Sequence, residues 1–336
     1  MKRRTLMAAV ATGALTVSLA ACGGGSTGGG SDQTILRLAL NQTEAHPSYV
    51  ALEDFSNRLE QATGGRYKLD IFANEVLGAQ QEILNLQRNG IVDLAIISST
   101  QLENINKDFQ VFNLPRVFDS VDHQMKVIND PDISGPLFKS LEQSNNLVVL
   151  GGFTQGERNL YTKRPVTDVA SLSGVKIRVQ ESPVMLAMIR AMGGNPTPMA
   201  YGEVYTALQA GVLDGAENNE VSYFTQKHYE VAPIYTYTKH LVGLDYMVAS
   251  AEALNKMTPE DRAIFDAEWT KTWQHFVQLW GKATDDAIKG ATEGGATFAE
   301  IDTAPFDEKL KPLAESLLSS DLQKQIYAKT REAAGQ

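Results

Sequence analysis

The amino-acid sequence predicts an α/β protein built as a clamshell, in which two α/β domains face each other across a cleft and a long helix bridges them. Three observations predict this fold class. Short apolar strands alternate with amphipathic helices between residues 35 and 98, the same alternation starts again after residue 175, and a later stretch carries aromatic residues at helical spacing.

The first alternating stretch contains three predicted strands and two predicted helices. Val50, Phe55 and Leu59 lie on one face of its first helix, which ends at a pair of glycines. Because helices join the strands, we expect a parallel sheet. The predicted elements are strand 35–40, helix 46–62, strand 67–73, helix 80–88, strand 93–98 and, after an irregular region with two helical stretches, strand 147–153.

The alternation then repeats and predicts a second α/β unit. Its expected elements are strand 176–179, helix 182–192, helix 202–210 and a short strand at 214–217. We expect domain I to comprise residues 33–155 and 244–283, and domain II to comprise residues 156–243 and 284–336.

Residues 259–291 predict one long amphipathic helix. Its aromatic residues recur at steps of four, four, three and four. At about 1.5 Å per residue this helix would be about 50 Å long, so it should lie across both units. We expect the aromatic stripe to be core rather than a ligand site. The stripe consists of Phe265, Trp269, Trp273, Phe276 and Trp280.

The N-terminus has the pattern of an export signal. A basic start is followed by an apolar run that ends at residue 21 and is shorter than the roughly 20 residues of a membrane-spanning helix. Residues 19–22 (LAAC) resemble the bacterial lipobox. We therefore expect a signal peptide at 1–21, a lipid on Cys22, and a Gly/Ser-rich tether at 22–32. Arg3 and Arg4 leave both Sec and twin-arginine export open.

Composition limits the class of partner. The chain has 336 residues and a net charge of −10, and removal of the three basic residues of the signal peptide leaves 27 basic against 40 acidic residues, a net charge of −13. Such a protein is a poor ligand for nucleic acid. Because Cys22 is the single cysteine, the fold must stand without disulfides on a large core.

Three polar positions are the best candidates for binding a solute. Arg178 interrupts an otherwise apolar strand, and a guanidinium there needs an anion, either a bound carboxylate or a local Asp or Glu. Asn218 ends a short strand with an amide that can donate and accept. Arg158 follows an apolar strand where the first unit meets the second, and the alternative for it is a plain surface position.

These stretches carry a resemblance. Segments 174–179 (GVKIRV), 191–199 (AMGGNPTPM) and 203–218 (EVYTALQAGVLDGAEN) resemble the solute-binding proteins of tripartite ATP-independent periplasmic (TRAP) transporters, the DctP family. The resemblance covers nearly all of residues 33–320. It implies a periplasmic-binding-protein-like clamshell in which Arg178 grips the carboxylate of a solute, Arg158 assists and Asn218 orients it.

Other contacts are expected from position. They come from loops at the strand ends that face the cleft, where open α/β sheets bind ligands, and from residues beside the first three candidates. The run 218–223 also resembles family members that take hexuronates and related sugar acids. The further candidates are His46, Glu75, Gln80, Ser99, Gln155, Asn219 and Tyr237.

The resemblance implies a binding protein rather than an enzyme. We expect a lipid-anchored extracytoplasmic monomer that binds a small organic acid, most simply a hexuronate, without cofactor or metal, and delivers it to the small and large membrane subunits of a permease. C4-dicarboxylates, sialic acid and 2-oxo acids are the alternatives. An exported hydrolase is disfavoured because its G-x-S-x-G pattern, at 24–28, lies in the tether rather than between a strand and a helix.

Overall fold

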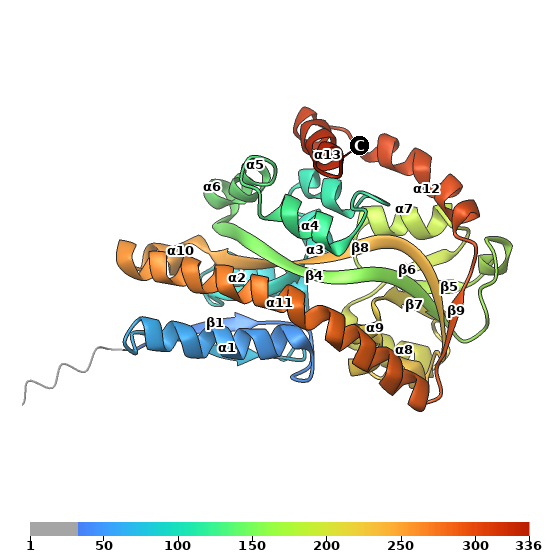
Figure 1. Cartoon of the computed structure of the whole chain (residues 1–336), viewed down its shortest axis with the longest axis horizontal. Helices are drawn as coiled ribbons and strands as arrows, with labels where there is room; N and C mark the ends of the chain where they lie inside the picture. Colours follow the sequence, from blue (N-terminus) through green and yellow to red (C-terminus); the bar gives the residue numbers. More distant parts are fainter. Residues whose placement is uncertain (1–32, 336) are drawn as a thin grey trace, which may run out of the picture. The chain divides into compact units, whose positions relative to one another are not determined.

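The computed structural model describes residues 33–335. The predicted signal peptide, the tether and Cys22 lie outside these residues. Within them, nine strands form one mixed sheet in the order β2-β1-β3-β8-β4-β7-β5-β6, with β9 paired to β8 (Figure 1). The predicted α/β class is confirmed. The parallel sheet expected for the first three strands is confirmed. The two central strands, β8 and β4, pair antiparallel with each other and with β3 and β7, whereas β9 pairs parallel with β8.

The first lobe is built on a parallel group in which β1 lies between β2 and β3. Its first helix starts where it does because Pro47 fits the first helical position and the Nδ1 atom of His46 accepts the Ser48 N–H at 3.1 Å. The elements of this part are β1 (Thr34–Ala39), α1 (Pro47–Ala62), β2 (Tyr67–Phe72), α2 (Gln80–Arg88), β3 (Leu94–Ser98), α3 (Ser99–Leu102), η1 (Lys107–Asn113), α4 (Val121–Ile128), α5 (Gly135–Phe138), η2 (Lys139–Leu141) and α6 (Glu142–Asn145).

The second lobe repeats the arrangement, with β5 between β6 and β7 in parallel. Val184, Met185, Met188 and Ile189 of its main helix are fully buried against β5. The elements are η3 (Ala170–Leu172), β5 (Lys176–Val179), α7 (Pro183–Ala191), β6 (Asn195–Pro198), η4 (Tyr201–Glu203), α8 (Val204–Gln209), β7 (Gly215–Asn218), α9 (Glu220–Thr225) and η5 (His228–Glu230).

Two long strands, β4 (Leu147–Thr162) and β8 (Ile234–Ser250), connect the lobes. They pair with each other, and at opposite ends β8 pairs with β3 and β4 pairs with β7. Their pairing shifts register near Gly156, whose φ of +61° is left-handed. A Cβ atom at Gly156 would lie 2.6 Å from Nε1 of Trp280, so only glycine fits at this bulge.

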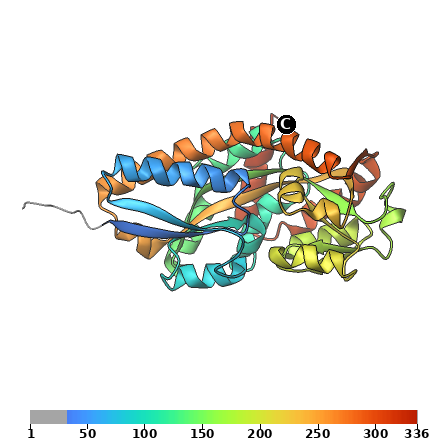
Figure 2. The same ribbon diagram turned by 90° about the horizontal axis from the view of Figure 1, so that it is seen from below.

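The long helix α11 (Pro259–Glu293) contains 35 residues and so extends for about 50 Å. It packs against α1 of the first lobe and α9 of the second (Figures 1 and 2). Phe265, Trp269, Phe276 and Trp280 are buried in the core beneath it, and Trp273 is partly buried and packs against the same core. The prediction that the aromatic stripe is core is confirmed for these four residues. The bridging helix predicted from the sequence is therefore present.

The remaining elements complete the cover of the sheet. They are α10 (Ala251–Asn255), β9 (Thr297–Glu300), α12 (Ala304–Leu317) and α13 (Asp321–Ala333). Phe306 and Leu310 of α12 join the core of the second lobe, whereas α13 packs on η1 and α4 of the first lobe. Residues 284–336 are expected in domain II from the sequence. The boundaries of both domains remain predictions. Among residues 33–335, no helix combines the length and apolarity needed to span a bilayer.

Candidate functional site

Arg178 is a buried cation that has no carboxylate partner among residues 33–335. It is the third residue of β5 and its side chain is only 3% exposed. Its Nε and Nη2 atoms donate to the main-chain oxygen of Met199 at 2.9 and 2.7 Å, and its guanidinium carbon lies 5.6 Å from the ring centre of Tyr201. No Asp or Glu of the described chain lies within ion-pair distance of it. Burial, with repulsion from Arg158, lowers its pKa.

A small cavity adjoins this guanidinium and is lined from both lobes. Its volume is about 20 Å³, room for about one water molecule. Most of its lining groups are amides, carboxylates and a phenol, which suit a polar solute. The lining residues are Asn41, Glu75, Ala79, Gln80 and Gln101 from the first lobe, and Arg178, Gln180, Glu181, Met199, Ala200 and Tyr201 from the second.

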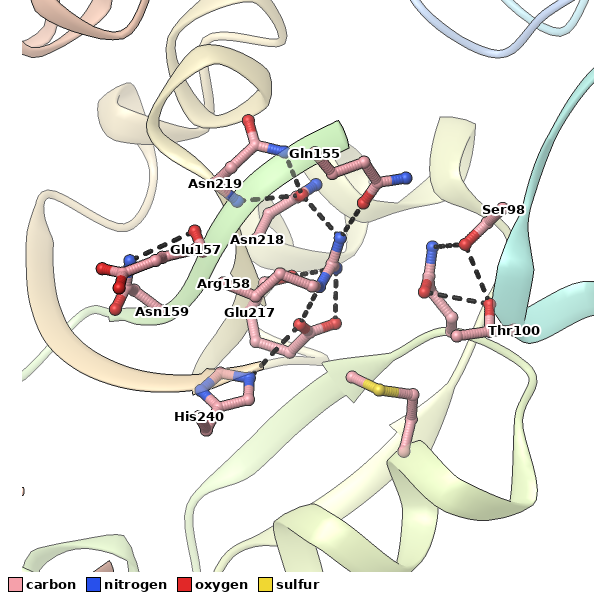
Figure 3. A network of polar contacts seen from close by, with 12 residues as sticks. Ser98, Thr100, Gln155, Glu157, Arg158, Asn159, Glu217, Asn218, Asn219 and His240 are labelled. Carbon is pink, nitrogen blue, oxygen red and sulfur yellow. Dashed lines mark hydrogen bonds and ion pairs between the residues drawn. The ribbon is translucent and has the colours of Figure 1, made fainter. Parts of the chain in front are cut away.

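Arg158 is paired within the protein. It is 1% exposed, and its Nε and Nη2 atoms form two parallel ion-pair contacts to Glu217, at 2.6 and 2.7 Å (Figure 3). His240 lies on the far side of that carboxylate, with Nε2 3.5 Å from Oε2. Burial alone would raise the pKa of Glu217, but the Arg158 charge and hydrogen bonds from His240 and Arg158 outweigh it and lower the pKa to about 2. The pair is a fixed, neutralised unit.

Two amides complete this network. Nη1 of Arg158 donates to Oε1 of Gln155 and, at 2.9 Å, to Oδ1 of Asn218. Gln155 in turn donates to Asp245, a carboxyl whose pKa is raised by burial to about 6. All five guanidinium hydrogens of Arg158 therefore have protein acceptors, the last being the Glu217 main-chain oxygen. Nδ2 of Asn218 donates to no described residue, so it is a donor of this network that has no acceptor among residues 33–335.

The first lobe places two of its predicted residues at the cavity. Glu75 lies in the turn after β2, where its left-handed φ of +56° is rare for a residue with a side chain, and its carboxylate accepts the Gly202 N–H of the second lobe at 2.8 Å. Gln80 accepts the Ser98 N–H through Oε1 at 3.0 Å, and its buried Nε2 has no partner. Both residues thus present polar groups to the solute side.

His46 has one engaged and one unengaged ring nitrogen. Because Nδ1 accepts the Ser48 N–H, the proton of the neutral ring belongs on Nε2, which is buried and has no partner among the described residues. Burial lowers the pKa of His46 to about 3, so the ring is a neutral donor at pH 7. It does not line the cavity at Arg178.

Three other predicted residues have structural roles in this arrangement. Ser99 donates to Asn113 inside the first lobe, and Asn219 caps α9 by accepting the Ser222 N–H at 2.7 Å. Tyr237 pairs with β9 and packs on Phe298. None of the three lines the cavity at Arg178.

The sequence had not pointed to several residues that the structure brings to the site. Gln180 follows Arg178 by two positions and so continues the same side of an extended chain, a signal that was available. Asn41 lies just after the first strand, where ligand contacts are expected. Tyr201 and the Glu217–His240 pair depend on packing between strands and loops, and no local pattern marks them.

Metal binding has no support within residues 33–335. No group of three or more His, Cys, Asp or Glu side chains in that range could hold a metal ion. The chemistry of the described site is thus that of a guanidinium, amides, carboxylates and a phenol.

Known proteins resemble this chain in sequence and in fold. The sequence model of the DctP family, described as "Bacterial extracellular solute-binding protein, family 7", matches residues 38–321. The chain is 32% identical to YiiZ of Salmonella typhimurium over 90% of this chain and 92% of YiiZ. It is 25% identical to the 2,3-diketo-L-gulonate-binding periplasmic protein YiaO of Escherichia coli, over 85% of this chain and 88% of that protein.

Solved structures agree. A TRAP periplasmic solute binding protein from Anaerococcus prevotii with bound D-glucuronate is 34% identical and superposes with a TM-score of 0.87 over 90% of this chain and 99% of its own. One from Xanthobacter autotrophicus with bound β-D-galacturonate is 28% identical, with a TM-score of 0.85 over 88% and 99%. The chain therefore belongs to the DctP family of bacterial extracellular solute-binding proteins, with their two-lobed α/β fold.

Proposed function

We propose that this protein captures a hexuronate outside the cytoplasmic membrane and delivers it to a TRAP permease. One observation carries the proposal: Arg178 is a buried guanidinium that faces a cavity lined from both lobes and has no carboxylate partner in the described chain. A buried cation requires a counter-charge, and a planar guanidinium binds a carboxylate through two parallel hydrogen bonds. The solute's carboxylate fits this role.

The rest of the cavity favours a hydroxylated acid. Nε2 of Gln80 is a buried donor without a partner among the described residues, and the carboxylate of Glu75 can accept hydroxyl hydrogens in addition to the Gly202 N–H. An alkyl carboxylic acid would leave the Gln80 donor unpaired, at a cost of about 1–3 kcal/mol. Glucuronate and galacturonate in the related structures are acids of this kind.

Binding requires the lobes to move. A cavity of about 20 Å³ holds about one water molecule, whereas a hexuronate has a dozen or so heavy atoms. We infer that the solute enters when the lobes separate and that contacts to both lobes then favour closure. The permease's membrane subunits would receive the closed form, and the protein would act as a monomer that catalyses no reaction on its solute.

A thermal-shift comparison tests the solute class. We expect D-glucuronate and D-galacturonate to raise the melting temperature, because binding only the native state at 100 times Kd adds about 2.7 kcal/mol of stability. D-glucose and D-galactose match their shape but lack the carboxylate, so they should not. A panel of succinate, sialic acid and pyruvate covers the other acids. If only uncharged sugars shifted the transition, the carboxylate proposal would be wrong.

The proposed location includes a lipid anchor on Cys22. A basic start, an apolar run and the LAAC sequence support it. A tether of about ten Gly- and Ser-rich residues would hold the protein near its permease at an effective concentration in the millimolar range. Cells fed labelled palmitate should incorporate label into the wild-type protein and not into Cys22→Ser. Equal labelling of both would contradict the assignment.

A further inference from the structure

A buried carboxylate outside the solute cavity joins the two lobes. Glu103 follows α3 in the first lobe, is 3% exposed, and does not line the cavity. One of its oxygens accepts a hydrogen bond from Asn113 of its own lobe at 2.7 Å. The other accepts the Ser182 hydroxyl at 2.8 Å and faces the Val184 N–H at 3.5 Å, both in the second lobe.

Ser182 and Val184 belong to the start of α7, the nine-residue helix that follows β5. Ser182 is the N-cap of α7 and accepts the Met185 N–H at 3.1 Å, so its hydroxyl is at once acceptor for the helix and donor to Glu103. A carboxylate at this end also interacts favourably with the helix dipole. Glu103 therefore caps a helix of the opposite lobe.

The short connection between β5 and α7 carries further contacts to the first lobe. Nδ2 of Asn104 donates to the main-chain oxygen of Glu181 at 2.8 Å. The Gln180 amide bridges Ser98 and Thr100, at 2.9 and 3.0 Å. We call the contacts of residues 180–184 with residues 98–104 the β5 latch. Only Val179 separates the latch from Arg178.

We propose that Glu103 is an affinity-determining positioning residue: without touching the solute, it holds the β5 latch, and through it Arg178, in the place from which the guanidinium grips a carboxylate. This inference rests on the proposed solute-binding function. Because the latch contacts join the two lobes, they form only when the lobes are together. Apparent affinity scales with the fraction of molecules in the binding-competent state, so a weaker latch gives weaker binding.

Calorimetry with D-glucuronate on two latch variants and a matched control tests the proposal. Burial raises the pKa of Glu103 to about 7, so the titrations are run at pH 8, where the carboxyl is mostly charged. Hydrogen bonds to a charged group correspond to about a 10- to 100-fold change, so Glu103→Ala should raise Kd by at least about tenfold. Asn104→Ala removes one exposed latch bond and should raise Kd by a few-fold, on the order of one neutral hydrogen bond. Asn106→Ala removes two bonds that both lie within the first lobe, one to Ser140 and one from the Asp108 N–H, each 2.9 Å long, and should leave Kd unchanged.

Two readouts separate positioning from a general loss of stability. The increase in Kd should come from faster dissociation in stopped-flow fluorescence. In an Arg178→Lys background, where the two-bond grip is already lost, Glu103→Ala should have a much smaller effect. Unchanged or tighter binding by both latch variants, or an equal effect in both backgrounds, would overturn the proposal. Because Asn104 is exposed, its variant keeps the test decisive even if Glu103→Ala does not fold.

Failure of the proposed solute-binding function can be distinguished from failure of the latch proposal. If the wild-type protein bound no hexuronate, that function would be wrong, and the latch would be judged on solute-free protein by small-angle scattering. There, Glu103→Ala should have a larger radius of gyration than Asn106→Ala. Equal radii in that case would overturn the latch.

Discussion

Replacing Arg178 by alanine is expected to abolish most of the binding of a hexuronate. Charge-assisted hydrogen bonds contribute about 1.5–3 kcal/mol each, so the loss of two corresponds to about 3 kcal/mol or more and a Kd at least about 150-fold higher. Calorimetry with D-glucuronate measures this directly. The folded protein should tolerate the change, because it removes a buried charge that has no carboxylate partner.

Two companion variants make the Arg178 result specific. Arg178→Lys keeps the charge but lacks the planar fork, so it should recover only part of the affinity. Arg190→Ala removes an exposed arginine from the last turn of α7 and should bind as the wild type does. An Arg178→Ala protein with wild-type affinity would show that the solute's carboxylate is held elsewhere.

Replacing Glu217 by glutamine is expected to have the largest effect on stability. It leaves the Arg158 guanidinium, 1% exposed, without its counter-charge, and breaking a buried pair in this way costs about 3–5 kcal/mol. Urea unfolding should show the midpoint falling accordingly. Glu142→Gln, which neutralises an exposed carboxylate on α6, should change the free energy of unfolding by less than about 0.5 kcal/mol.

The same pair should set the acid limit of stability. The folded-state pKa of Glu217, about 2, lies below its ordinary value of 4.5. The contribution of ionised Glu217 to the free energy of unfolding is therefore complete above pH 4.5. It is lost as the pH falls from 4.5 through 2, while Arg158 stays charged. The Glu217→Gln protein should lose less stability than the wild type over that window. Parallel pH profiles for the two proteins would contradict the pairing.

The sequence predicted most strands and helices up to residue 218 and the long helix α11, because their apolar residues keep a regular period, but it did not mark β6, β9, α12 or α13. It missed β8 entirely and saw only the first seven residues of β4. Both strands carry charged residues in their middle, among them Arg158 and His240, which break the apolar pattern. Those residues are stable there because partners arrive from the neighbouring strands, and such pairing is not visible in one segment at a time.

The sequence predicted only part of the candidate site, because only residues that stand out in their own segment could be singled out. Arg178 could be singled out because a charge inside an apolar strand is conspicuous, and Glu75 and Gln80 because they follow strand ends. For Arg178 the sequence left a salt bridge and a ligand equally open, and for Arg158 it left a ligand and a plain surface position open, without pointing to a buried ion pair. The structure distinguishes them, since Glu217 lies against Arg158 and no described carboxylate pairs with Arg178.

The most direct test of the central proposal is a crystal structure of the protein with D-glucuronate. We expect both carboxylate oxygens at about 2.7–2.9 Å from the Arg178 guanidinium, with the sugar hydroxyls toward Glu75 and the amides of the first lobe. Arg158 should remain paired with Glu217. A glucuronate whose carboxylate lies away from Arg178, with a hydroxyl in its place, would show that Arg178 does not bind the carboxylate.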